Sequence, residues 1–219
     1  SDFLYLSLTD YMQHKYAPDE PESLDFYEGI DREIGQLLEL GAIVGATADH
    51  GMNGKCHADG SINVLYLETE LEKKFGEGCR VICPITDPYV VHHGALGAAV
   101  NVYLSDGHDR AAVGRWILAQ PGVAEVYDRE SAAEKLALPA NRIGDFFVLS
   151  TRNAVIGRTP EHHDLSKLDG SLRSHGGRYE EMVPLVLSEP LSADYRARAA
   201  ADPRNFDIFD FVCNGVATS

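Results

Sequence analysis

The sequence predicts an α/β fold, a doubly wound, mainly parallel sheet with an inserted α+β cap. One observation is the alternation of strand, helix and strand patterns between residues 3 and 47, where both strand patterns are apolar along their length. Strands that helices cover on both faces have this composition, which is typical of parallel sheets. A second observation is that polar clusters directly follow these strands, and ligands of parallel sheets bind at the carboxyl ends of strands.

The first elements follow in order along the chain. Residues 3–8 form an apolar run that predicts a strand ending at Thr9 and Asp10. A helix follows, for which Ser23 is a suitable cap and Gly41 a suitable stop. Residues 42–47 are the second predicted strand, which again ends in a polar cluster. The apolar residues of the helix have the spacing of a single face: Phe26, Ile30, Ile34, Leu37 and Leu38.

The middle of the chain has a different organisation. Residues 98–150 alternate strand, helix, strand, helix and strand, as in a small α+β module. We therefore divide the chain into a core over residues 1–53, an inserted cap over 54–159 and a continuation of the core over 160–219. The predicted strands here are 62–67, 80–85, 98–104, 123–127, 145–150 and 183–188, and the predicted helices are 69–75, 110–120, 130–138 and 192–201.

The composition argues against several classes of protein. With 219 residues, of which 44% are hydrophobic, the chain is long enough to bury a large core. A net charge of −15 argues against a nucleic-acid partner, because phosphates require a basic surface. No apolar stretch approaches the ~20 residues of a membrane span, and residues 1–4 do not begin a signal peptide. Four cysteines without metal or disulfide spacing predict free thiols and a cytoplasmic protein.

Three short motifs carry carboxylates and imidazoles in positions that suit a metal ion. Asp10 and His14 are four residues apart, so both face one side if the chain turns helical after the first strand. Asp49 and His50 precede a glycine, which permits the sharp turn that two adjacent ligands need. His175 precedes two glycines, which allow a close approach of the backbone. Oxygen and imidazole ligands of this kind suit divalent metals, zinc above all.

Each motif taken alone also has an ordinary structural explanation. Asp10 can cap a helix, Asp49 can begin a turn, and His175 can lie in a polar loop. The fixed order of all three motifs favours a shared metal site. Lys15 and Lys55 lie beside the motifs, where they either attract an anion or are solvated surface residues.

The order Asp-x-x-x-His, Asp-His-Gly-Met and His-Gly-Gly resembles the two-zinc phosphodiesterase and phosphonatase branch of the alkaline phosphatase superfamily. The longer strings over residues 9–18 and 48–53 are most similar to those of the phosphonoacetate hydrolase family. The resemblance extends over the whole chain. The doubly wound core of that family, with its inserted cap, agrees with the elements predicted above.

The resemblance implies two zinc ions as cofactors. Asp10, His14 and His175 would bind one zinc, and Asp49 and His50 the other. In the family, the second zinc has a further aspartate ligand, and a threonine is the nucleophile. We expect both in an N-terminal part of the core that lies outside this chain, because the chain opens directly on the strand before Asp10. We therefore expect no catalytic nucleophile here and assign no substrate-binding residue.

The activity implied by the resemblance is zinc-dependent hydrolysis of the carbon–phosphorus bond of phosphonoacetate to acetate and phosphate. One alternative is a nucleotide pyrophosphatase or phosphodiesterase of the same superfamily, and another is a non-catalytic, metal-bound half that needs a partner chain. A cofactor-independent phosphomutase fits less well, because its serine and basic substrate clamps are not visible. The expected partners are a small anionic phosphonate and the N-terminal segment, and the sequence leaves a homodimer open.

Overall fold

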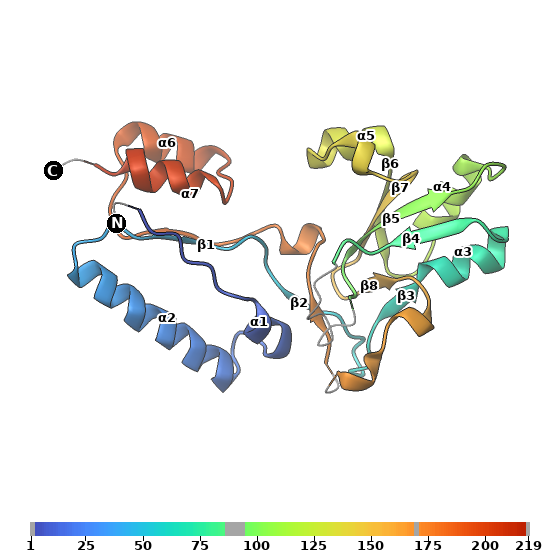
Figure 1. Ribbon diagram of the computed structural model, residues 1–219, viewed down its shortest axis with the longest axis horizontal. Coiled ribbons are helices and arrows are strands. Elements are labelled where there is room, and N and C mark those ends of the chain that lie inside the picture. The colour runs from blue at the N-terminus through green and yellow to red at the C-terminus, as the bar shows by residue number, and fades with distance from the viewer. Residues whose placement is uncertain (1–2, 86–94, 169–170, 218–219) are drawn as a thin grey trace. The chain divides into compact units, whose positions relative to one another are not determined.

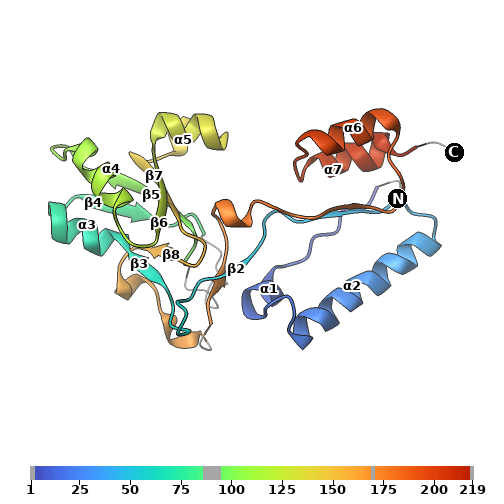
Figure 2. The same cartoon turned by 180° about the vertical axis from the view of Figure 1, so that it is seen from behind.

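The computed structural model describes residues 3–85, 95–168 and 171–217, which form two compact units (Figures 1 and 2). The first unit comprises the described parts of Ser1–Lys15 and Met52–Glu180, and the second those of Tyr16–Gly51 and Glu181–Ser219. Helices and strands occur in both units, as predicted for an α/β protein. The predicted limits of the inserted cap, residues 54 and 159, stay a prediction.

The largest sheet of the first unit has four antiparallel strands in the order β4-β5-β7-β6. Val102 of β5 pairs with Val81 of β4 and with Phe146 of β7, so the three side chains share one face. The sequence predicted all four strands to within three residues at each end. They are β4 (Cys79–Ile82), β5 (Ala99–Leu104), β6 (Val123–Asp128) and β7 (Phe146–Ser150).

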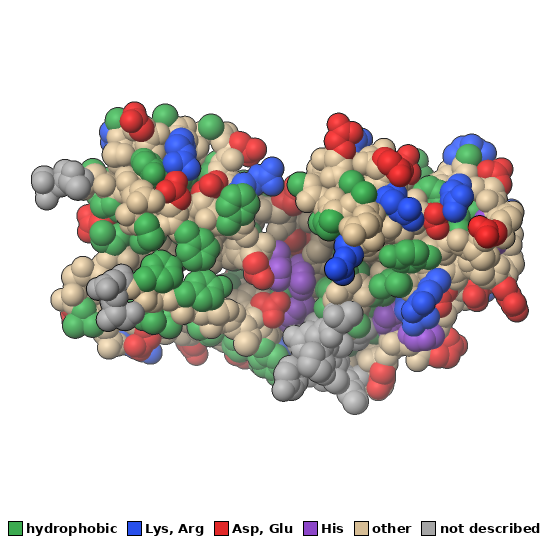
Figure 3. Space-filling model, turned by 45° about the horizontal axis from the view of Figure 1, so that its top comes forward, with side chains coloured by type: hydrophobic (Ala, Val, Ile, Leu, Met, Phe, Trp, Pro, Cys, Tyr) green, Lys and Arg blue, Asp and Glu red, His purple; other side chains and the backbone are tan. Residues whose placement is uncertain are grey.

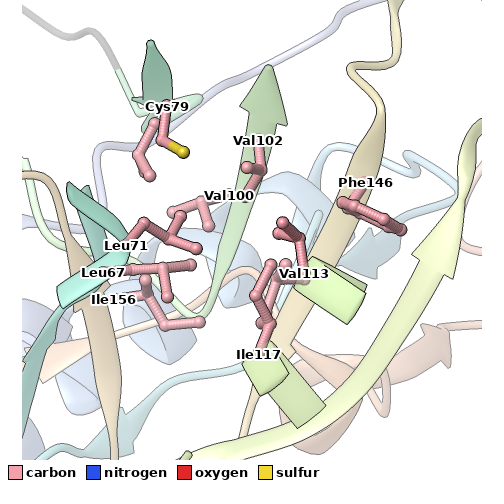
Figure 4. Packing of buried hydrophobic residues seen from close by; sticks show 11 residues of the cluster. Leu67, Leu71, Cys79, Val100, Val102, Val113, Ile117, Phe146 and Ile156 are labelled. Carbon is pink, nitrogen blue, oxygen red and sulfur yellow. The ribbon is translucent and has the colours of Figure 1, made fainter. Parts of the chain in front are cut away.

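Two helices pack on this face and complete the main core (Figure 4). Leu67 and Leu71 lie one turn apart on α3 (Leu67–Phe75), and Val113 and Ile117 one turn apart on α4 (Arg110–Leu118). All four side chains are fully buried. Each such side chain stabilises the fold by roughly 1.5–3 kcal/mol relative to an exposed one, so this sheet and its helices form the stable centre of the first unit.

Shorter elements of the first unit position the residues of interest. β2 (Asn53–Gly54) pairs with β9 (Arg173–Ser174) in an antiparallel ladder, and α1 (Tyr11–Lys15) contacts β9. β3 (Val64–Tyr66) pairs with β8 (Val155–Gly157) in a parallel ladder. The remaining helices of this unit are α5 (Arg129–Leu136) and the 3₁₀ turns Ala140–Arg142, Pro160–His162, Leu165–Lys167 and Arg178–Glu180.

The second unit contains one two-stranded sheet and several helices. β1 (Gly45–Thr47) pairs with β10 (Leu185–Leu187) in an antiparallel ladder. A Cβ atom on Gly45 would lie 2.4 Å from Cγ2 of Val212 and 3.0 Å from Cγ1 of Ile208, so glycine allows the helical segment to approach β1. Figures 1 and 2 both show α6 beside α7. The helices of this unit are α2 (Pro21–Glu39), α6 (Ala193–Ala201), α7 (Asp207–Asp210) and the π-helix Phe211–Gly215.

Two predictions about strands are wrong. Residues 3–8 lie in no ladder of the described residues, and Leu4, Leu6 and Leu8 are 63%, 65% and 64% exposed. An apolar run predicts burial, but a strand also needs backbone hydrogen bonds from a neighbour, which the run does not specify. The predicted predominance of parallel pairing is also not found, because the ladders between described strands are antiparallel except for β3 with β8. A short apolar run does not encode the direction of its neighbour.

The helix predicted from the apolar spacing of residues 26–38 is confirmed, with a shifted start. It begins at Pro21 rather than after Ser23, which is a buried residue of the first turn. Proline is favoured at the first helical position because its fixed φ suits the helix. The N–H that proline lacks would have no acceptor within the helix at that position. Gly41 has φ +78° just after the C-cap, as expected for a helix stop.

The surface carries charge of both signs. Figure 3 shows acidic side chains spread over the face in view, with basic side chains among them. Acidic residues outnumber basic ones by 34 to 19 in the sequence. Within the described ranges, no helix has both the length and the apolar character that crossing a bilayer requires.

The four cysteines are free thiols, as predicted, and their environments differ. Burial raises the pKa of the Cys83 thiol to about 11, whereas Cys213 is exposed. With this pKa, about 0.1% of Cys83 would be ionised at pH 8, and the thiolate is the reactive form. We expect dithionitrobenzoate at pH 8 to modify Cys213 rapidly and Cys83 only after unfolding, which mass spectrometry of the peptides measures. Equal rates at both thiols in the native protein would contradict this, and the urea-unfolded chain is the control.

Candidate metal centre

Three of the predicted ligands converge in the first unit. Oδ2 of Asp10 lies 3.0 Å from Nε2 of His14 and 3.9 Å from Nε2 of His175. The two imidazole ring centroids are 5.4 Å apart. One donor atom from each of the three residues lies within 4.8 Å of the other two. The carboxylate and imidazole of Asp10 and His14 and the imidazole of His175, which is distant in the sequence, therefore face one point.

Helix α1 positions the first two of these side chains. Asp10 immediately precedes α1, and its carbonyl oxygen accepts a hydrogen bond from the backbone N–H of His14 at 3.0 Å. Residues one helical turn apart present their side chains to the same side. The side chain of His14 is 2% exposed and that of Asp10 is 44% exposed, so the carboxylate remains accessible from solvent. The chain does turn helical after Asp10, which is the condition under which the four-residue spacing brings both side chains to one side.

Strand β9 fixes the orientation of the His14 ring. Nδ1 of His14 lies 2.8 Å from the carbonyl oxygen of Arg173. A proton on Nδ1 that is donated to this carbonyl leaves the lone pair of Nε2 directed toward Asp10, as a metal-bound imidazole requires. The Nε–H of Arg173 donates in return to the carbonyl oxygen of Gln13 at 2.8 Å. Two hydrogen bonds thus hold α1 against β9.

The third ligand lies on a tight loop that directly follows β9. The carbonyl oxygen of His175 accepts a hydrogen bond from the N–H of Ala98 at 2.8 Å. Gly176 has φ +102°, in the left-handed region that favours glycine. A Cβ atom on Gly177 would lie 2.9 Å from Cβ of Ala98. The two glycines therefore permit the close backbone approach that the sequence predicted.

A buried ion pair beside this loop was missed by the sequence interpretation. Nζ of Lys55 lies 3.0 Å from Oε1 of Glu180, and the two side chains are 0% and 1% exposed. Both interpretations offered for Lys55, an exposed anion attractor and a solvated surface residue, are wrong. Burial lowers the pKa of Lys55, and its hydrogen bond to Glu180 opposes that shift. No sequence pattern signals this burial, because a lysine is buried only with a partner that the local sequence does not show.

The donor set in the first unit fits a zinc ion. Tetrahedral zinc with bonds of about 2.0–2.1 Å to nitrogen and oxygen places its donor atoms roughly 3.3 Å from one another. The observed separations of 3.0 and 3.9 Å lie on either side of that value. Three protein ligands leave the fourth position for water or substrate, which is typical of catalytic rather than structural zinc sites.

The other two predicted ligands lie in the second unit, shortly after β1. Oδ1 of Asp49 accepts a hydrogen bond from the N–H of His50 at 3.1 Å, and Oδ2 lies 3.6 Å from Nε2 of His50. Nδ1 of His50 is 3.0 Å from the carbonyl oxygen of Gly51. The side chain of Asp49 is 86% exposed, and that of His50 is 24% exposed. The assignment of both residues to a second metal ion stays a prediction.

Comparison with known proteins assigns a family. Residues 3–178 match the model of the type I phosphodiesterase/nucleotide pyrophosphatase family. The chain belongs to this family. The match includes all five predicted metal ligands, from Asp10 to His175.

Solved structures similar to this family member include phosphonoacetate hydrolase from Sinorhizobium meliloti 1021. Its complexes with phosphonoformate and phosphonoacetate are 45% identical to the chain, with TM-scores of 0.83 and 0.82. Each alignment covers 95% of this chain and 50% of the other. Murine ectonucleotide pyrophosphatase/phosphodiesterase 5, at 18% identity and a TM-score of 0.62 over 99% of this chain and 55% of that one, shares the fold.

These matches confirm the predicted alkaline-phosphatase-like mixture of helices and strands, and the predicted resemblance to phosphonoacetate hydrolase. The chain spans about half the length of the solved chains to which it is similar.

Proposed function

We propose that this chain is the metal-binding part of a zinc-dependent phosphonoacetate hydrolase, which cleaves the carbon–phosphorus bond to give acetate and phosphate. The observation that carries the proposal is the 45% identity to the Sinorhizobium meliloti enzyme over 95% of the chain. The convergence of Asp10, His14 and His175 supports it, because the donors suit a zinc site with an open position.

In this proposal the residues of this chain bind the metal ion and orient its ligands, and none of them is the nucleophile that attacks phosphorus. Bound zinc would act as a Lewis acid that stabilises negative charge developing on phosphoryl oxygens. Asp10 supplies the anionic donor, and the Arg173 carbonyl holds the His14 ring with Nε2 toward it. The loop after β9 brings the third donor, Nε2 of His175, to 3.9 Å from Oδ2 of Asp10. We propose that the nucleophilic threonine and the further aspartate come from the N-terminal segment, and that Asp49 and His50 bind the second zinc.

The substrate itself makes the cleavage of its carbon–phosphorus bond feasible. The nucleophile forms a bond to phosphorus as the carbon–phosphorus bond breaks, so the phosphoryl group is transferred to the nucleophile and the electron pair stays on the methylene carbon. The adjacent carboxylate of phosphonoacetate delocalises this charge, and protonation of the carbon gives acetate. Hydrolysis of the phosphorylated nucleophile releases phosphate.

A reconstitution experiment tests this function. We expect phosphate release from phosphonoacetate when the chain is combined with the N-terminal segment and zinc, and none from either part alone. A chelator should abolish the activity and added zinc should restore it. Full turnover by the metal-free assembly would contradict the proposal. The matched control is His57→Ala, since His57 is an exposed histidine outside the three-donor group and its loss should leave the activity unchanged.

A nucleotide pyrophosphatase or phosphodiesterase is the second candidate, favoured by the family model that the chain matches. The same assembly would then cleave a nitrophenyl phosphodiester and release no phosphate from phosphonoacetate. A non-catalytic half would bind zinc and the N-terminal segment while the assembly stays inactive toward both substrates.

A further inference from the structure

The carboxylate of Glu180 joins three hydrogen-bond donors from two segments of the first unit. Its Oε1 accepts hydrogen bonds from Nζ of Lys55 at 3.0 Å and from Nδ2 of Asn53 at 2.6 Å. Its Oε2 accepts a hydrogen bond from the backbone N–H of Gly177 at 2.9 Å. Nζ of Lys55 also donates to the carbonyl oxygen of Arg152 at 2.9 Å. Both charged groups of the pair are therefore fully enclosed and well bonded.

Stability alone does not explain a buried pair of this kind. Removing two charges from water costs several kcal/mol per ion, and well-packed apolar residues of similar volume are often equally stable or more stable. Buried polar groups are better explained where they hold one particular arrangement of the backbone. The backbone segment next to the Lys55–Glu180 pair is the loop that carries His175.

Two of the donors to Glu180, Asn53 and Lys55, lie on or directly after β2, which pairs with the strand that precedes this loop. Asn53 of β2 pairs with Ser174 of β9, and the N–H of Lys55 donates to the carbonyl oxygen of Leu172 at 2.7 Å. The chain leaves β9, passes through His175 and returns at Glu180 to Asn53 of β2, so the carboxylate ties the end of the loop to the strand that pairs with β9. Strand β9 is also the strand whose backbone orients the His14 ring.

We propose that Glu180 and Lys55 are positioning residues of the metal centre, which hold the loop 175–177 so that Nε2 of His175 faces Oδ2 of Asp10. The naming of zinc as the ion rests on the proposed function. Neither residue is among the three donors, and both act through the loop. Without the carboxylate, the N–H of Gly177 loses its acceptor, and two consecutive glycines regain their conformational freedom. Ordering the backbone of a residue costs conformational entropy, and metal binding would then have to offset that cost.

Two variants of the full chain test this proposal. Glu180→Gln removes the charge but nearly keeps the shape, and Lys55→Met/Glu180→Leu replaces the pair by apolar side chains and removes the acceptor for Gly177. We expect zinc dissociation constants, measured by competition with a chelator, to rise 10–100-fold in both variants, the range found for outer-shell partners of metal ligands. The double variant removes both charges together, so it decides the matter if Glu180→Gln does not fold.

The matched control is Glu68→Gln. Glu68 is a buried carboxylate of the same unit that pairs with Arg158 at 3.0 Å and accepts a hydrogen bond from the N–H of Val81 at 2.6 Å. This variant should lose stability and keep its zinc affinity. Equal zinc affinity in the folded double variant and the wild type would overturn the proposal, and so would an equal loss of affinity in the control.

Amide hydrogen exchange of the metal-free protein separates this inference from the proposed function. Exchange at Gly177 should be faster in the double variant than in the wild type, whatever metal the site takes. A wild-type chain that binds no zinc would contradict the proposed function, whereas unchanged exchange at Gly177 would overturn the positioning role.

Discussion

Replacement of His175 by alanine is expected to lower the zinc content of the protein by about one ion per chain. The substitution removes one of three donors and leaves only Asp10 and His14, a carboxylate and an imidazole that would not retain zinc through dialysis. Elemental analysis of the dialysed protein measures the change. His57→Ala is the matched control, because it removes an exposed histidine of the same unit and should leave the zinc content unchanged.

This substitution also separates a loss of metal from a loss of fold. The side chain of His175 is 17% exposed, and the loop keeps its backbone hydrogen bonds to Ala98 and Glu180 when the imidazole is removed. We therefore expect the circular dichroism spectrum of the metal-free variant to match that of the metal-free wild type. An unchanged zinc content in His175→Ala would exclude this residue as a ligand.

Replacement of Lys55 by alanine is expected to lower the free energy of unfolding of the metal-free chain by about 3–5 kcal/mol. The variant leaves the Glu180 carboxylate buried without a counter-charge and also opens a cavity where the lysine chain was packed. Urea denaturation measures the difference. The control is Lys73→Ala, because Lys73 pairs with Glu70 at 2.7 Å on the surface and such pairs contribute about 0–1 kcal/mol.

The Lys55→Met/Glu180→Leu double variant should recover most of the stability that Lys55→Ala loses. Replacing both partners by apolar groups of similar volume leaves no charge buried, so the main penalty disappears. A loss below about 1 kcal/mol in Lys55→Ala would show that the buried carboxylate finds other compensation, contrary to this account.

The elements that could be predicted are those whose pattern is local. Val113 and Ile117 have the four-residue spacing of a helix that packs on a sheet, and the helix predicted over residues 110–120 is found as α4. The helix predicted over residues 69–75 is found as α3, which begins two residues earlier, at Leu67. Strand direction could not be predicted, because it depends on which distant strand donates the backbone hydrogen bonds. Residues 3–8 show the same limit, since their composition predicts burial while their leucines are exposed.

The candidate site could be predicted in its residue types but not in its support. Asp10, His14 and His175 were recognised from their chemistry and order, and the structure brings the three together. The orientation of His14 by a carbonyl 159 residues away leaves no trace in either local sequence. The pairing of Lys55 with Glu180, 125 residues apart, could not be predicted either, because only the folded backbone brings the buried lysine to its partner.

The hydrogen bonds that join α1 to β9 connect opposite ends of the first unit's sequence. An ion held by Asp10, His14 and His175 would therefore cross-link residues that are distant in the sequence. Its binding site would form only after the first unit has folded. Free ion at a hundred times its dissociation constant would add about 2.7 kcal/mol to the folding equilibrium. Without the ion, a larger fraction of molecules would be unfolded and open to proteolysis.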